Sequence, residues 1–108
     1  MDFLDYQNKA YRTRDKKLDR EESIKKSLVS LAGEVGELSN TLKKHLWHGH
    51  WLDINEVEGE LGDILWYLTD ITTSLSLDLE DVAVQNIKKL RERYPNGFSE
   101  KDSIERTV

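Results

Sequence analysis

The 108-residue sequence contains no cysteine and only one proline. Without cysteine the chain can form neither a disulfide nor a zinc–thiolate centre, and it has no thiolate nucleophile. No apolar stretch approaches the roughly 20 residues that a membrane-spanning helix needs, and the first residues lack the apolar centre of a signal peptide. These absences favour a cytoplasmic protein that does not enter a membrane.

The charge balance is acidic, with a formal net charge of −5. This sign argues against a protein that binds nucleic acid through bulk electrostatics, although a small anionic ligand could still be held through a metal ion. Charged residues make up 34% and hydrophobic residues 37% of the chain, as in helix-rich domains. A domain of this size buries only about 60–65% of its surface alone, so we expect self-association.

Apolar periodicity predicts four helices, over about 2–14, 23–46, 53–75 and 78–94. Gly49 interrupts the pattern between the second and third helices, Asp53 is a plausible N-cap, and Pro95 follows the fourth helix. The charged run 14–22 is expected to be an exposed connection or a frayed helix end. No alternating strand pattern is present. The sequence therefore predicts an all-α fold, a four-helix bundle formed by one domain over 1–98, with a polar tail over 99–108.

Two nearly identical hexapeptides, GEVGEL at 33–38 and GELGDI at 59–64, lie inside the second and third predicted helices. They contain four of the six glycines of the chain. A glycine inside a helix costs about 1 kcal/mol relative to alanine, so four of them indicate a compensating gain. The glycines lie on the side of each helix away from its apolar stripe. We expect another helix, from this chain or another subunit, to approach closely there.

The same hexapeptides place two acidic residues at i and i+3 on one face of each helix: Glu34 with Glu37, and Glu60 with Asp63. Both pairs lie on the same flank of the apolar stripe. If the helices pack antiparallel through their stripes, four carboxylates can face one cleft. Carboxylates that are close together repel one another unless cations neutralise them, and ligand sets of acids alone suit Mg²⁺, Mn²⁺ or Ca²⁺.

The predicted helices also carry basic and amide side chains that could contact phosphate. Lys44 is two turns beyond Glu37 on the same helical face, whereas Lys43 points about 100° away. Asn86 and Lys89 share one face of the fourth helix. Mg²⁺ held by carboxylates usually binds substrate phosphates, which favours hydrolysis of a phosphate ester or anhydride. A di-iron centre would instead require Glu-x-x-His pairs, which these helices lack.

A nucleobase also needs a flat apolar wall, and Trp47 and Trp51 flank the helix break where such a wall could form. Trp66 and Tyr67, in the middle of a helix, are expected to pack in the core. The histidines at 45, 48 and 50 have no acidic ligand beside them and are expected at the surface.

These segments resemble the MazG-like nucleotide pyrophosphohydrolases of the all-α NTP pyrophosphatase superfamily. The resemblance rests on ExxE and ExxD separated by 22 residues, on KK at 43–44, and on NIKKLRERYPNGF at 86–98. The opening YQNKAYRT at 6–13 is also similar. Tandem two-domain members end differently, so their substrate preference should not be transferred to this chain.

The resemblance implies hydrolysis of a nucleoside triphosphate to a monophosphate and pyrophosphate, as a house-cleaning activity on the nucleotide pool. A branch acting on dCTP, dUTP or phosphoribosyl-ATP is an alternative within the same fold. It further implies that Glu34, Glu37, Glu60 and Asp63 bind Mg²⁺, or Mn²⁺, and that one of them positions or deprotonates the attacking water. Lys44, Asn86 and Lys89 would contact phosphate or sugar, with Lys43 and Trp47 as secondary candidates.

Two further expectations concern assembly. The resemblance implies a dimer or a dimer of dimers, with sites near subunit contacts. The competing hypothesis is a non-catalytic helical dimerisation module, in which the acidic residues are only solvated.

Overall fold

The computed structural model describes all 108 residues and contains five helices and no strand. They are α1 (Phe3–Tyr11), α2 (Arg20–His48), α3 (Ile54–Ser74), α4 (Leu79–Arg93) and α5 (Glu100–Ile104). The predicted all-α fold is confirmed. None of the helices combines the length and the apolar character needed to span a membrane.

The ends of the long helices follow from local capping. Asp53 accepts hydrogen bonds from the backbone N–H groups of Asn55 and Glu56 and so begins α3. Gly49 ends α2 in the left-handed conformation, with φ 70°. At the start of α2, Asp19 and Glu22 form a capping box, which places the first residue at Arg20, earlier than predicted.

Two segments are more ordered than expected. The charged run 14–22 is not simply an exposed connection, because Arg14 pairs with Asp70 at 3.0 Å and its side chain is largely buried. The polar tail contains the short helix α5, which Ser99 caps by accepting a hydrogen bond from the N–H of Asp102. Both segments are polar in composition, and their polar side chains form specific interactions: Arg14 pairs with a buried carboxylate, and Ser99 caps a helix.

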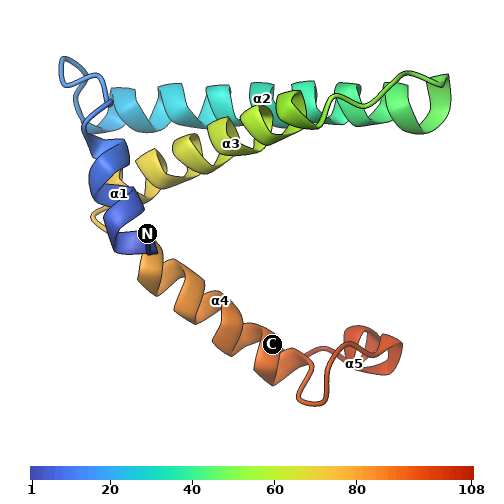
Figure 1. The fold of residues 1–108 in the computed structure, drawn as a ribbon. Helices are drawn as coiled ribbons and strands as arrows, with labels where there is room; N and C mark the ends of the chain where they lie inside the picture. The colour runs from blue at the N-terminus through green and yellow to red at the C-terminus, as the bar shows by residue number, and fades with distance from the viewer.

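Helices α2 and α3 lie side by side as an antiparallel pair (Figure 1). The fully buried residues of these two helices are all polar, among them Ser23 and Ser27 on α2 and Glu60 and Asp70 on α3, and Ser27 donates a hydrogen bond to Asp70. Part of each apolar stripe is half-buried, including Leu31 and Leu38 on α2 and Ile64 and Leu65 on α3. Several other stripe residues are exposed: Leu28, Val35, Leu61 and Leu68 are 58%, 45%, 51% and 42% exposed.

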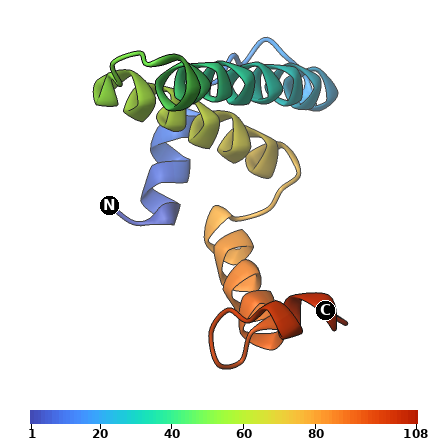
Figure 2. The same ribbon diagram turned by 90° about the vertical axis from the view of Figure 1, so that its right-hand side faces the viewer.

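Helix α4 leaves the end of α3 and points away from the α2–α3 pair, while α1 packs against both α3 and the start of α4 (Figures 1 and 2). The molecule is accordingly extended. Its Cα radius of gyration is 17.1 Å, whereas a compact domain of this length has a radius of about 13 Å. The helices of a bundle are present, but one chain leaves their apolar faces uncovered.

The single chain has almost no apolar core. Only 9 of 108 residues are buried, and Leu79 is the one apolar residue among them. The chain exposes 8310 Å², although a compact monomer of 12.6 kDa would expose about 6,200 Å². The difference of about 2,100 Å² is surface that a folded domain of this size normally removes from water.

The helical glycines face open space. A Cβ atom built at Gly33, Gly36, Gly59 or Gly62 would meet no heavy atom within 4 Å. No helix of this chain packs against these glycines, so the expected close approach of a helix from the same chain is wrong. Approach of a helix from another subunit stays a prediction.

Candidate metal and substrate site

The antiparallel α2–α3 pair brings the two acidic motifs together. The pKa of Glu34 is raised, first by burial and then by the negative charges of Glu37 and Asp63, a hydrogen bond with Glu37, and the charge of Glu60. Carboxylates on two helices therefore act on one another across the α2–α3 contact. They meet because the helices pack along the flank that carries the acids.

Two of these carboxylates have an oxygen without any partner. Oε2 of Glu34 and Oε2 of Glu60 are both out of contact with solvent and accept no hydrogen bond. The other Glu60 oxygen, Oε1, accepts a hydrogen bond of 3.0 Å from Oγ1 of Thr41. Buried carboxylate oxygens without donors are costly, and such groups usually pair with a cation or a metal.

The chain supplies no cation to this cluster. Its two ion pairs, Lys9–Asp5 and Arg14–Asp70, involve none of the four carboxylates. The oxygen-only donor set fits Mg²⁺ or Mn²⁺, which prefer carboxylate and water ligands. No three acidic or histidine side chains surround a common point as they stand. Holding a metal ion therefore requires some of these side chains to rotate.

A second polar network continues along the α2–α3 contact from the acidic cluster. Asp70 accepts a hydrogen bond of 2.6 Å from Ser27 and pairs with Arg14. Close by, Nε1 of Trp66 donates a hydrogen bond of 2.8 Å to Oγ1 of Thr13. The sequence reasoning expected Trp66 in the core and missed this network. Its only sequence signal is the position of Asp70 seven residues after Asp63, on the same face of the helix.

Helix α1 contributes Tyr6, which was not among the predicted site residues. The pKa of Tyr6 is raised by burial and then by the negative charge of Asp63. Tyr6 therefore lies within electrostatic reach of Asp63.

The predicted substrate-binding residues are divided between two parts of the molecule. Lys43, Lys44 and Trp47 lie in the last turns of α2, and Trp47 is 75% exposed. Asn86 and Lys89 line an open groove on α4. Because α4 points away from the α2–α3 pair, one chain does not bring Asn86 and Lys89 to the carboxylates (Figure 1).

His45 and His48 lie in the last turn of α2, and His50 follows its C-cap, Gly49. Nδ1 of His45 lies 2.9 Å from the backbone oxygen of His50, and all three histidines are exposed. They take part in no group of three potential ligands. Their predicted surface position is confirmed.

The raised pKa of Glu34 predicts an effect of Glu34→Gln on stability. Because the pKa is higher in the folded state, the ionised carboxylate opposes folding at neutral pH, and this penalty is relieved as the pH falls through the folded pKa. Without metal, Glu34→Gln should raise the unfolding midpoint at pH 7 and should lose its advantage over the wild type in acid. Thermal unfolding of both proteins in EDTA from pH 4 to 8 measures this. An unchanged or lower midpoint for Glu34→Gln at pH 7 would contradict the prediction.

Comparison with known proteins gives a consistent result. Residues 21–98 match the model of the MazG nucleotide pyrophosphohydrolase domain. The gene 37 protein of Mycobacterium phage L5 is 31% identical over 83 residues, which cover 73% of this chain and 73% of the phage protein. No solved structure matches. The range matched by the family model covers α3, α4 and all of α2 except its first residue, and it includes the four carboxylates.

Proposed function

Because the chain belongs to the MazG nucleotide pyrophosphohydrolase family, we propose that it hydrolyses a nucleoside triphosphate, ribose or deoxyribose, to the monophosphate and pyrophosphate. The proposal includes dependence on Mg²⁺, or Mn²⁺, and a role in clearing nucleotides from a cytoplasmic pool. The observation that carries it is the pair of buried, unpartnered oxygens on Glu34 and Glu60. These oxygens come from two helices and belong to one repulsive cluster of acids.

The proposed roles follow from this arrangement. Glu34, Glu37, Glu60 and Asp63 would hold the metal, and Thr41 keeps the Glu60 carboxylate in its orientation through one hydrogen bond. A bound divalent ion would neutralise the triphosphate and lower the pKa of the attacking water. One of the four carboxylates would position that water or accept its proton. Lys44 lies on the same helix as Glu37 and would contact phosphate.

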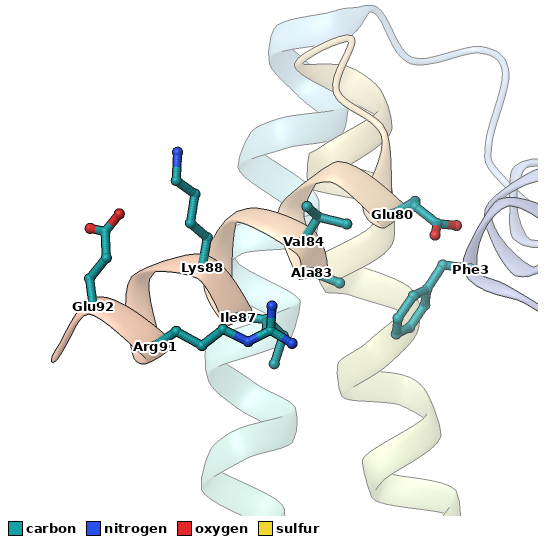
Figure 3. A pocket seen from close by; sticks show the side chains of 8 residues that line it. All are labelled: Phe3, Glu80, Ala83, Val84, Ile87, Lys88, Arg91 and Glu92. Carbon is teal, nitrogen blue, oxygen red and sulfur yellow. The ribbon is translucent and has the colours of Figure 1, made fainter. Parts of the chain in front are cut away.

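A second copy of the chain would complete the site. The surface in excess of a compact monomer, about 2,100 Å², is in the range that stable dimers bury per partner. An open groove of about 660 Å³ lies between α1 and α4, where Phe3 faces Ala83, Val84 and Ile87 (Figure 3). We propose that helices of a partner cover these apolar faces and that Asn86 and Lys89 reach the carboxylates of the other subunit.

A panel of nucleoside triphosphates tests the proposed activity. With Mg²⁺ we expect release of pyrophosphate, and not of inorganic phosphate, from at least one substrate. EDTA should reduce the rate to background, and Mg²⁺ or Mn²⁺ should restore it. Release of inorganic phosphate in place of pyrophosphate would contradict the proposed position of cleavage.

Metal-linked stability separates the enzyme from a non-catalytic dimerisation module. A divalent ion that binds only the folded state stabilises it by about 2.7 kcal/mol at one hundred times its dissociation constant. We therefore expect Mn²⁺ to raise the unfolding midpoint of the wild type. A scaffold whose acids are only solvated would not respond to Mn²⁺, and an absent response would favour that alternative.

A further inference from the structure

Gln7 is a buried polar residue outside the acidic cluster, and it connects three parts of the chain. It lies on α1 and is 8% exposed. Its Nε2 donates hydrogen bonds of 3.0 Å to Oγ1 of Thr73 and to the backbone oxygen of Leu77. Its Oε1 accepts a hydrogen bond of 2.8 Å from the N–H of Leu79. Both of its donor hydrogens and its acceptor are therefore used.

These contacts lie at the point where α3 passes into α4. Two residues after the end of α3, Ser76 lies in the left-handed region at φ 58°, which residues other than glycine rarely adopt. The N–H groups of Leu77 and Ser76 bond back to the carbonyl oxygens of Thr72 and Thr73. This pair of bonds closes the end of α3 and leaves the Leu77 carbonyl and the Leu79 N–H to find other partners.

Gln7 supplies both of those partners. Asp78 occupies the N-cap position of α4 but makes no side-chain capping bond. The Leu79 N–H, at the first residue of α4, is instead bonded to Gln7, and Leu79 is itself 4% exposed. The side chain of Gln7 thus satisfies one of the free N–H groups at the start of α4 and joins this end of α4 to α1.

We propose that Gln7 is a positioning residue that fixes the direction of α4 relative to the α2–α3 pair. This inference rests on the proposed function for its consequence, because α4 carries Asn86 and Lys89 and one side of the α1–α4 groove (Figure 3). Beyond the linker, α4 packs only lightly on α1 and α3 (Figure 2). Loss of the Gln7 bonds would therefore allow α4 to change its orientation relative to α2 and α3, and Asn86 and Lys89 would move with it.

Distance measurement between spin labels tests the positioning directly. The wild-type chain has no cysteine, so Ser39→Cys on α2 and Gln85→Cys on α4 provide the only two labelling sites. Labelled protein is diluted with unlabelled protein so that distances within one chain are recorded. We expect one narrow distribution in the Gln7 background and a broader one with Gln7→Met, which keeps the side-chain size but removes all three bonds. Asn8→Ala, an exposed neighbour on α1, is the matched control and should leave the distribution narrow.

Kinetics supply a second measurement with the substrate found in the nucleotide panel. Gln7→Met should raise KM roughly tenfold, the factor that corresponds to about one lost hydrogen bond. It should change kcat little, and it should leave the Mn²⁺-induced rise in the unfolding midpoint intact, since the acids lie on α2 and α3. A purely structural defect would lower metal-linked stabilisation as well.

The outcomes separate the two proposals. An unchanged distance distribution in Gln7→Met overturns the positioning role, whatever the kinetics show. Absence of hydrolysis in the wild type overturns the proposed function, while the distances still decide the role of Gln7. If Gln7→Met does not fold, Gln7→Glu takes its place, because its carboxylate can still accept from the Leu79 N–H but cannot donate to Leu77 or Thr73.

Discussion

Glu60→Gln is expected to reduce kcat/KM for nucleoside triphosphate hydrolysis by about 10²–10⁴-fold. Glu60 is the most buried of the four carboxylates, at 8% exposed, and its Oε2 is one of the two oxygens without a partner. Glutamine keeps the size of the side chain and can retain the bond from Thr41 through its carbonyl oxygen. It removes the negative charge and one strong metal-binding oxygen.

The same variant should separate catalysis from folding. Without metal, the neutral amide removes one repulsive charge beside Glu34, so the protein should unfold at the same temperature as the wild type or higher. The rise in the unfolding midpoint on adding Mn²⁺ should be lost. The matched control is Glu58→Gln, which makes the same chemical change at an exposed position on α3. Full activity in Glu60→Gln, or an equal loss of activity in Glu58→Gln, would show that the carboxylate cluster is not the catalytic metal site.

Leu28→Asp is expected to convert the assembled protein to monomers. Leu28 belongs to the apolar stripe of α2 and is 58% exposed in the single chain. If a partner covers it, a charge there would be buried without a counter-ion, at a cost of several kcal/mol. Sedimentation velocity should show the change in mass, and hydrolysis should fall together with assembly.

A control for this variant is available at the other end of the molecule. Ile104 on α5 is 84% exposed, and Ile104→Asp makes the same kind of substitution outside the proposed interface. It should leave both mass and activity unchanged. A Leu28→Asp protein that keeps the mass of the wild type would show that the α2 stripe is not the contact between subunits.

The sequence predicts most of the helical organisation because local signals determine it. Asp53, Gly49 and Pro95 end or begin helices through interactions with residues close to them in the chain. The relation between the two acidic motifs was also accessible, since i and i+3 spacing fixes which side of a helix they share. The roles of the four carboxylates, of Lys44, and of Asn86 with Lys89 stay predictions.

The partner of each helix face could not be predicted in the same way. An apolar stripe indicates which face leaves water, but it does not indicate whether the covering helix belongs to the same chain. The sequence pointed to packing of α2 on α3 through their apolar stripes. In the structure Leu28 and Leu68 of those stripes are exposed, and a buried hydrogen bond from Ser27 to Asp70 joins the two helices. Small polar residues and a buried acid carry no periodic hydrophobic signal, so this contact had no visible pattern.

Gln7 and Arg14 illustrate a second limit. Each bonds to residues about 60–70 positions away, at Ser74 and Leu79 among others. A single polar side chain that bonds to groups far away in the chain produces no periodic pattern and no change in composition that the sequence would show. Such contacts depend on the tertiary arrangement, and they become visible only when the chain is folded.

Leu79 is the only fully buried apolar residue of the chain. This near absence of an apolar core affects how the protein folds after synthesis. If a second copy covers the exposed apolar faces, as proposed above, folding and association become a single second-order reaction. At low concentration, newly synthesised chains would then remain partly folded until two of them associate. The amount of working enzyme would then rise more steeply than the amount of protein synthesised.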